Sequence, residues 1–323
     1  MGARGVICKV QDLDLKNKRV FIRVDFNVPL RKTGEVFEVA DSARIEGAME
    51  TIRFAMEAGA MVILASHLGR PKVRADLRYS LMPVGQKLSE LLDKEVILTE
   101  DCIGDGPRGL SQQMRQGDVL LLENLRFHAG EEENSPEFAS RLLELCDVYV
   151  SDAFGTLHRA HASTHGLPKL MEQRAIGFLV QKELKFLEPL KDNPKRPIVL
   201  VMGGAKVSDK IGVIERFLPK VDKILIGGAM AYAFLRAKGV EIGKSLSEDK
   251  QVDLAAKLLK GAEARNIEIL LPVDHITSHK VDDTGNVKTT IDASIASDRM
   301  GLDIGPKTIA IYRSALEGVS TVF

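Results

Sequence analysis

Hydrophobic and polar positions in the first half of the chain follow one repeated pattern. A short run of β-branched or aliphatic residues is followed by a polar cluster and then by a helical stretch. Continuous apolar runs of this kind are typical of parallel strands that are covered on both faces. The pattern therefore predicts strands at residues 20–24, 61–65, 119–122 and 148–150, linked as βαβ units.

The clearest predicted helix lies between the first two runs. Apolar residues recur at helical spacing from Ile45 to Met56. Asp41 or Ser42 is a suitable amino-terminal cap, and Gly59 a suitable end signal. A helix over this stretch would cover one face of the predicted sheet.

The second half repeats the architecture after a break. The helical pattern of residues 177–190 is followed at 191–197 by two prolines and three cations. We therefore predict an α/β protein with two doubly wound, parallel-sheet (Rossmann-like) domains joined by a hinge helix. The predicted segments are a first domain at 1–178, a hinge helix and linker at 179–196, and a second domain at 197–323. Strands are expected at 198–202, 224–226 and 267–271, and a helix at 254–265.

The final residues, 319–323, read like the beginning of another buried parallel strand. A terminus seldom lies in such a strand. We therefore expect the second domain to be incomplete in this sequence.

Composition narrows the function classes. Among 323 residues, 45 basic side chains balance 45 acidic ones, so no net charge favours nucleic acid or a membrane as partner. The amino terminus lacks an apolar signal segment, and the three cysteines are widely spaced. We therefore expect a cytoplasmic protein. The sequence gives no sign of oligomerisation either way, and a monomer is the expected state.

Polar residues that could bind a ligand follow directly after the predicted strands of the first half. In an open α/β sheet, ligands bind beyond the carboxyl ends of the strands. The polar residues at these positions are mostly cations, and Arg44 begins the first helix. Such recurrence predicts an anion site, although single loop arginines are often only solvated or ion-paired. The residues concerned are Arg23, Asp25, Asn27, His67, Arg70, Lys72, Arg126, His128, His158, Arg159 and His161.

Several other motif matches are weaker. Residues 104–109 fit G-x-G-x-x-G, but an internal proline and a polar lead-in favour a turn over a dinucleotide fingerprint. His158, His161 and His165 have spacings seen in zinc sites, but no cysteine or carboxylate beside them completes a set. Anion contact or loop hydrogen bonding is the preferred interpretation of these histidines.

The second half contains glycine-rich turns after its strands. Residues 202–210 combine a strand end, paired glycines and two lysines, Lys206 and Lys210, four positions apart. Glycines let backbone amides approach a phosphate, and lysines neutralise it. A tight turn with solvated lysines is the alternative interpretation. Residues 227–228 and 301–307 would add thin walls beside a flat base.

Taken together, these segments resemble the phosphoglycerate kinase family over essentially the whole chain. The resemblance rests on long motifs in the family's order. They are RVDFNVP at 23–29, HLGRP at 67–71, ENLRF at 123–127, DAFGT at 152–156, HRAHAS at 158–163, GGAKVSDK at 203–210 and GLDIGPK at 301–307.

The resemblance implies specific ligands and roles. Phosphoryl transfer would run reversibly between 1,3-bisphosphoglycerate and ADP, giving 3-phosphoglycerate and ATP, with Mg²⁺ carried as Mg-ADP or Mg-ATP. Residues implied to hold 3-phosphoglycerate or its acyl phosphate are Asp25, Asn27, Arg44, His67, Arg70, Arg126 and Arg159. Residues implied to bind the nucleotide are Gly204, Ala205, Lys206, Asp209, Lys210, Gly227, Gly228, Gly301 and Leu302.

This chemistry needs no general base, because the accepting carboxylate has an intrinsic pKa of about 4. It needs in-line positioning and positive charge, for which Arg44 and Lys206 are the catalytic candidates. The hinge segment is expected to bring the two substrate domains together and exclude water.

Two features depart from the family pattern. Ser151 and Leu157 stand where asparagine and alanine are more usual. The family also continues past 321–323 into a glycine-rich loop and a final helix. Because this sequence lacks these two segments, an alternative function is a protein that binds the phosphorylated acid without turnover. A nicotinamide-dependent oxidoreductase is a further alternative, based on fold analogy alone.

Overall fold

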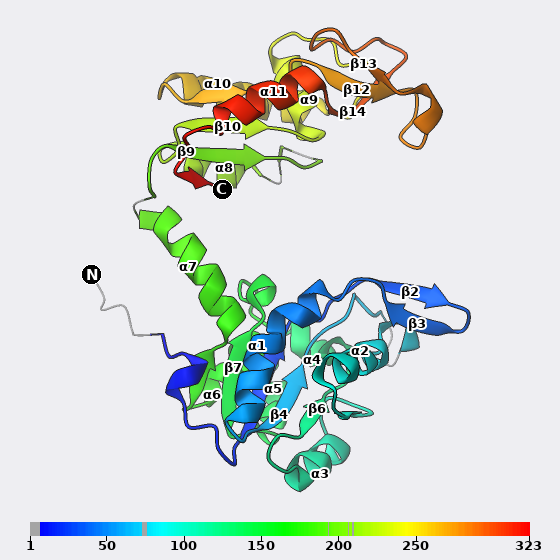
Figure 1. Cartoon of the computed structure of the whole chain (residues 1–323), viewed down its shortest axis with the longest axis vertical. Coiled ribbons are helices and arrows are strands. Elements are labelled where there is room, and N and C mark those ends of the chain that lie inside the picture. Colours follow the sequence, from blue (N-terminus) through cyan, green and yellow to red (C-terminus); the bar gives the residue numbers. More distant parts are fainter. Residues whose placement is uncertain (1–6, 73–75, 193, 206, 209) are drawn as a thin grey trace. The chain divides into compact units, whose positions relative to one another are not determined.

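The computed structural model describes residues 7–72, 76–192, 194–205, 207–208 and 210–323. The chain divides into two compact units, Met1–Leu187 and Glu188–Phe323 (Figure 1). The division falls within residues 179–196, which the sequence marks as a connecting segment, and each unit has its own parallel sheet.

The first unit contains a parallel sheet with the strand order β5-β6-β4-β1-β7-β8. The order places the first strand of the sequence near the middle, as in a doubly wound sheet. The strands are β1 (Arg19–Val24), β4 (Met61–Ala65), β5 (Val96–Leu98), β6 (Val119–Leu121), β7 (Val148–Asp152) and β8 (Arg174–Ile176).

Side chains alternate between the two faces of this sheet, so the hydrophobic core of the unit consists of two clusters, one on each face. Val20, Ile22 and Val24 of β1 pack with residues of α1 (Ala43–Glu57) and α2 (Met82–Leu92). Phe21 of β1 and Tyr149 of β7 pack on the other face with α5 (Pro136–Leu143) and α6 (Leu167–Leu170). Helices therefore cover both faces, which explains why each central strand contains a continuous run of apolar residues.

Helix α1 forms where the spacing from Ile45 to Met56 predicts it. Asp41 Oδ1 accepts a hydrogen bond from the Ala43 amide at 2.9 Å, and Gly59 follows the helix with a φ of 78°. Thus Asp41 satisfies a free amide at the beginning of the helix.

The peripheral elements were not predicted from the sequence. They include strands β5 and β8 and the antiparallel hairpin of β2 (Leu30–Thr33) and β3 (Val36–Val39). The turn expected at residues 104–109 is wrong, because α3 (Asp105–Gln113) begins there with Pro107 in its first turn, where proline is tolerated. The remaining helix of this unit, α4, spans Ala129–Glu132, and α7 (Phe178–Asp192) continues into the second unit.

The second unit contains a parallel sheet with the order β11-β10-β9-β15. The parallel sheet confirms the predicted architecture, and a separate antiparallel sheet, β13-β12-β14, was not predicted. The strands are β9 (Ile198–Met202), β10 (Lys223–Ile226), β11 (Glu268–Leu270), β12 (His275–Ser278), β13 (Lys288–Thr289), β14 (Met300–Ile304) and β15 (Thr321–Val322). The helices are α8 (Ile211–Phe217), α9 (Met230–Ala237), α10 (Asp249–Glu263) and α11 (Pro306–Ala315).

Strand β15 forms at the expected place and pairs in parallel with β9. The prediction that this strand is buried is wrong. Val322 is 55% exposed and Phe323 is 40% exposed, because β15 lies at the edge of its sheet. Among the residues described here, no helix has both the length and the apolar character needed to cross a membrane.

Candidate functional site

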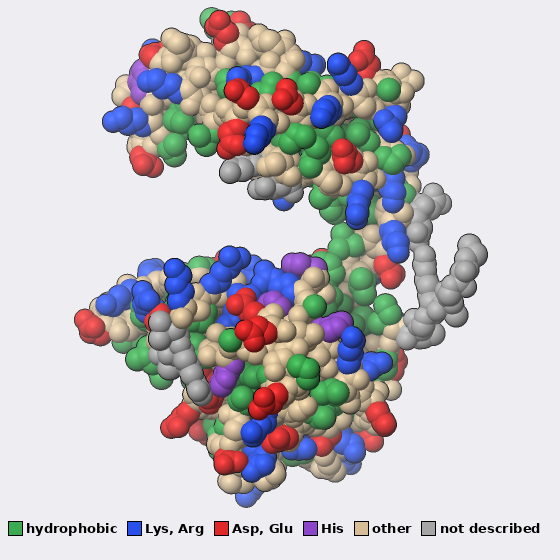
Figure 2. Space-filling view, turned by 180° about the vertical axis from the view of Figure 1, so that it is seen from behind, with side chains coloured by type: hydrophobic (Ala, Val, Ile, Leu, Met, Phe, Trp, Pro, Cys, Tyr) green, Lys and Arg blue, Asp and Glu red, His purple; other side chains and the backbone are tan. Residues whose placement is uncertain are grey.

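The carboxyl ends of β1, β4, β6 and β7 meet at one edge of the first sheet because these strands are parallel neighbours. Each strand leads into a loop that carries polar residues singled out in the sequence. Figure 2 shows Lys and Arg side chains gathered along one edge of this unit, with His side chains among them. The candidate substrate site, called the cation cluster below, consists of Asp25, Asn27, Arg44, His67, Arg70, Arg126 and Arg159 with the buried Arg23.

Arg126 occupies the short helical turn η3 (Leu125–Phe127) after β6. Its side chain is 4% exposed, Nη1 donates to the Gly69 carbonyl at 2.8 Å, and Nη2 lies 2.9 Å from Glu132 Oε1. Within the described part of the chain, Arg126 Nε is buried without a hydrogen-bond partner. The guanidinium therefore retains an unsatisfied donor.

Electrostatic neighbours show that cations from different loops converge on Arg126. Burial lowers the pKa of Arg126, and the positive charges of Arg159, Arg70 and Arg23 lower it further, against the opposing effect of Glu132. Three loops thus bring like charges together at a partly desolvated position. A bound anion would relieve this repulsion.

His67 follows β4 and lies beside Arg23 of β1, which is 1% exposed. Arg23 Nη2 is 3.3 Å from His67 Nδ1. Burial lowers the pKa of His67 to about 2, with further lowering by Arg23 and Arg126. The imidazole is therefore neutral at pH 7 and contributes a hydrogen bond instead of a charge.

Arg23 is held by a buried network that sequence reasoning missed. Arg23 Nε donates to Ser163 Oγ at 2.8 Å, and Ser163 Oγ donates to Glu131 Oε1 at 2.6 Å. Glu131 also accepts from the Ser163 amide at 2.9 Å and is 0% exposed. This carboxylate compensates the buried guanidinium, as buried charges require. A glutamate in a polar, charged segment gave no sequence signal of burial.

Asp25 and Asn27 follow β1 and organise neighbouring groups. Arg44 Nη1 donates to Asp25 Oδ2 at 2.8 Å, while the Arg44 side chain remains 53% exposed. Asn27 Oδ1 accepts from the Gly69 amide at 2.8 Å. Gly69, at a φ of 60°, is thereby held between Asn27 and Arg126, and a Cβ there would lie 2.4 Å from the Tyr79 ring.

The remaining cations of the cluster are Arg70 and Arg159, and His158 and His161 lie near them in sequence. Arg70 is exposed and Arg159 is half-buried, and both lower the pKa of Arg126. Arg159 Nε lies 3.5 Å from His158 Nε2, and His161 Nδ1 lies 3.8 Å from Glu131 Oε1. The structure thus brings residues from four strand ends into one basic site with neutral His67 inside it.

The second unit places its glycine turns against each other. Gly203 and Gly204 follow β9, and Gly227 and Gly228 follow β10. A Cβ on Gly228, at a φ of 63°, would lie 2.9 Å from the Gly204 amide nitrogen. The Gly204 carbonyl accepts from the Met230 amide at 2.8 Å. Close approach of two backbones is the physical reason for glycine at this position.

The remaining predicted nucleotide residues are less closely grouped. Ala205 and Lys210 are exposed, and Lys210 is the residue before α8. Gly301 and Leu302 lie in β14, and a Cβ on Gly301 would overlap Tyr232 Oη of α9. Lys206 and Asp209 lie outside the described residues.

Comparison with known proteins supports the motif order. The family model described as phosphoglycerate kinase matches residues 10–323. A phosphoglycerate kinase of an Anaeromyxobacter species is 53% identical over 316 residues, covering 97% of this chain and 79% of the relative. One from Bdellovibrio bacteriovorus is 47% identical, with coverages of 100% and 79%.

Solved structures give the same result. Phosphoglycerate kinase from Coxiella burnetii superposes with a TM-score of 0.81 at 38% identity, covering 98% of this chain and 79% of that structure. The enzyme from Pyrococcus horikoshii gives a TM-score of 0.82 at 31% identity, with coverages of 98% and 80%. The similarity therefore spans both units.

Proposed function

The chain belongs to the phosphoglycerate kinase family, and from this premise we propose that it transfers a phosphoryl group reversibly from 1,3-bisphosphoglycerate to ADP. The products are 3-phosphoglycerate and ATP. The observation that supports these residue roles is the cation cluster, where Arg126 Nε is buried with no hydrogen-bond partner among the described residues and has further cations near it. A phosphorylated carboxylic acid supplies the negative charge that such a cluster lacks.

The phosphorylated acid would occupy the first unit. Arg70, Arg126 and Arg159 bind its phosphate and carboxyl oxygens by charge-assisted hydrogen bonds, while neutral His67 donates without adding charge. Asp25 and Asn27 support the pocket by orienting Arg44 and Gly69. The cluster is thus suited to a small dianion or trianion.

The nucleotide would occupy the second unit. Gly204, Ala205, Gly227 and Gly228 form a thin backbone surface against which ADP or ATP lies. Lys210 contributes positive charge near the phosphates, and Lys206, Asp209, Gly301 and Leu302 retain their predicted nucleotide roles. Mg²⁺ arrives with the nucleotide, as Mg-ADP or Mg-ATP.

The chemical step requires positioning more than proton transfer. In the glycolytic direction, a β-phosphate oxygen of ADP attacks the acyl phosphate, a new P–O bond forms, and the bond to the carboxyl oxygen breaks. The leaving carboxylate, with an intrinsic pKa of about 4, needs no proton. Arg44 and Lys206 would stabilise charge on the migrating phosphoryl group.

Residues 179–196 would allow the two units to bring their substrates together. This proposal is supported by the division of the chain into compact units at Leu187 and Glu188. Water exclusion on closure would protect the acyl phosphate from hydrolysis. We place the enzyme in the cytoplasm as a monomer, consistent with three free cysteines and with both substrate sites on one chain.

The test is coupled ATP formation from Mg-ADP and 1,3-bisphosphoglycerate. Arg44→Ala should lower kcat at least about a hundredfold, since one stabilising contact to transition-state charge contributes about 3 kcal/mol. Arg53→Ala is the matched control, because Arg53 lies on the same helix and donates to the Leu91 carbonyl at 2.7 Å. It should retain turnover.

Equal loss in both variants would contradict the role of Arg44. Absence of turnover in the unaltered chain, with 3-phosphoglycerate binding retained, would instead support the binding protein without turnover. Binding of NAD without binding of ADP would support the oxidoreductase.

A further inference from the structure

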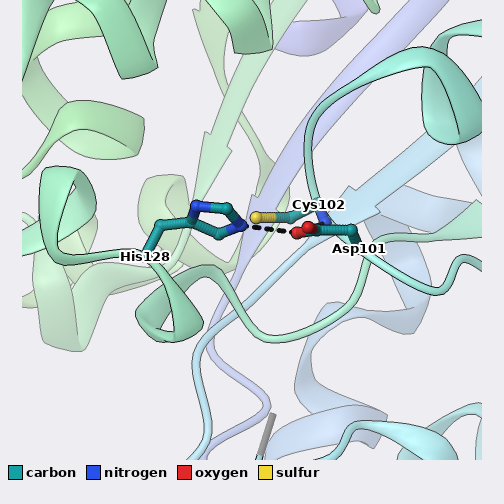
Figure 3. A group of neighbouring side chains, drawn as sticks. All are labelled: Asp101, Cys102 and His128. Carbon is teal, nitrogen blue, oxygen red and sulfur yellow. Dashed lines mark hydrogen bonds and ion pairs between the residues drawn. The ribbon is translucent and has the colours of Figure 1, made fainter. Parts of the chain in front are cut away.

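A second cluster of reactive side chains lies outside the cation cluster. Asp101 and Cys102 follow β5, and His128 follows the η3 turn after β6. One potential ligand atom from each residue lies within 4.8 Å of the other two. Figure 3 shows the thiol and the carboxylate both turned toward the same edge of the imidazole.

The three groups are the donor types that a zinc ion selects. Thiolate, imidazole and carboxylate bind Zn²⁺ at about 2.0–2.3 Å, and three protein ligands with one open position are a common arrangement. His128 Nε2 already lies 2.5 Å from Asp101 Oδ1, so two donors converge before any ion enters. A small outward movement of these donors would make room for the ion.

Access to the cluster is provided by a surface cavity of about 550 Å³. Asp101 and His128 line this cavity together with Gly130, Glu137 and Phe138. Cys102 lies behind them and is 0% exposed. An ion entering from the cavity would contact imidazole and carboxylate first, reach the thiol at the base, and retain one position toward solvent.

Local structure holds the donors in place. Thr99 Oγ1 donates to the Asp101 carbonyl, the Cys102 amide donates to Asp101 Oδ1 at 2.7 Å, and the His128 amide donates to the Leu125 carbonyl at 3.2 Å. The His128 ring also packs on Phe138, with 5.4 Å between centroids. Ordered donors reduce the entropy lost on binding.

The third donor, the Cys102 thiol, is buried beside the Asp101 carboxylate and forms part of the hydrophobic core of this unit. A divalent cation would bind this sulfur as a thiolate, because coordination deprotonates a thiol.

We propose that Asp101, Cys102 and His128 form a Zn²⁺-binding site, with the fourth position open to the cavity. Binding forms a Zn–S bond and releases the thiol proton to solvent. The ion would tie the loop after β5 to the turn after β6. That turn also carries Arg126, two residues before His128, and the proposed site shares no residue with the cation cluster.

The test uses Co²⁺ as a spectroscopic substitute for Zn²⁺ on the full chain after treatment with a chelator. Stoichiometric Co²⁺ should give tetrahedral d–d bands and a thiolate-to-cobalt charge-transfer band, and added Zn²⁺ should remove both. Cys102→Ser should abolish the charge-transfer band and weaken Zn²⁺ binding about a hundredfold or more. Cys146→Ser is the matched control, because Cys146 is also buried but neighbours Arg19 and Asp147.

Further variants keep the test decisive. If Cys102→Ser does not fold, His128→Gln at the partly exposed side of the site should weaken Zn²⁺ binding at least about tenfold. A charge-transfer band that persists in folded Cys102→Ser, equal loss in Cys146→Ser, or no band in the unaltered chain would each overturn the proposal.

Discussion

The two units build their candidate sites by different physical means. The first unit uses long charged side chains whose positions depend on a buried network, in which Glu131 compensates Arg23 through Ser163. The second unit uses the absence of side chains, because Gly204 and Gly228 approach so closely that a single Cβ would lie 2.9 Å from a backbone nitrogen.

The difference matches the chemistry of the two proposed substrates. A small phosphorylated acid offers only charge and hydrogen-bond acceptors, so converging cations give affinity and orientation. A nucleotide offers a flat base and sugar, for which a thin backbone wall provides contact area. Changes in the first unit should therefore act through charge compensation, and changes in the second through steric space.

The largest expected effect tests charge compensation. Glu131→Gln leaves the buried Arg23 without its carboxylate and should lower the free energy of unfolding of the first unit by about 3 kcal/mol. Hydrogen exchange at the amides of β1 and β7 would measure this loss within one unit. Glu133→Gln, at an exposed position near Glu131, is the control and should change little. Equal protection in both variants would show that Arg23 needs no buried counter-charge.

The next largest expected effect is on ADP affinity, and it tests the close approach of the two glycine turns in the second unit. Gly228→Ala should force the turns apart, because the new Cβ would meet the Gly204 nitrogen and oxygen at 2.9 and 3.2 Å. We expect ADP to bind about tenfold to a hundredfold more weakly, equivalent to about 1.4–2.8 kcal/mol. Calorimetric titration with ADP and, separately, with 3-phosphoglycerate would show loss of the first affinity alone.

Gly261→Ala is the control for this substitution. Gly261 lies in α10, and its Cβ would make only ordinary contacts at 3.8 Å. It should retain ADP affinity and stabilise the helix by about 0.5–1 kcal/mol. Unchanged ADP affinity in Gly228→Ala would refute the steric explanation.

The smallest expected effect is on the pH dependence of stability, and it is tested at one buried carboxyl group in each unit. In the first unit, burial raises the pKa of Asp152 to about 6, and within the described residues Oδ2 has no hydrogen-bond partner. In the second, burial also raises the pKa of Asp274, but hydrogen bonds from Thr308 and the Lys307 amide outweigh it and give net lowering. The two groups should therefore contribute to stability with opposite dependence on pH.

For Asp152, folded and unfolded chains both hold the proton below about pH 4, and only the folded chain holds it between about pH 4 and 6. Stability should therefore fall as pH rises through this window. Asp152→Asn should remove the fall and be more stable at pH 7 by about 1–2 kcal/mol. Urea denaturation at pH 4 and pH 7 would measure it.

Asp274→Asn should behave in the opposite way. The lowered pKa of Asp274 contributes stability above the unfolded pKa, and this contribution is lost as pH falls through the folded pKa. The variant should thus lose most stability at neutral pH. The same sign of change in both variants at pH 7 would contradict the contrast between the carboxyl groups.

Central elements were more predictable than peripheral ones. Strands β1, β4, β6 and β7 are buried on both faces, so their apolar runs are long enough to recognise. Strand β5 is only partly buried and the hairpin β2-β3 is largely exposed, so neither carries a clear pattern of burial on both faces. Helix α3 was missed because glycine and proline indicate a turn unless tertiary packing decides otherwise.

The candidate site shows the same division. Arg126 was predicted because it follows a recognisable strand. The burial of Arg23 and Glu131 was not predicted, because charged residues are rarely buried unless paired and their pairing joins segments more than 100 residues apart.

The sequence by itself determined the family, through motifs in a specific order, and the local placement of polar residues after strands. Only the tertiary structure decided which of these residues meet. It made His67 neutral among charged arginines, brought Gly228 against Gly204, and placed His128 beside Cys102. The physical reason is that periodicity and turn chemistry act over a few residues, whereas strand order and the packing of loops at a sheet edge depend on contacts between distant parts of the chain.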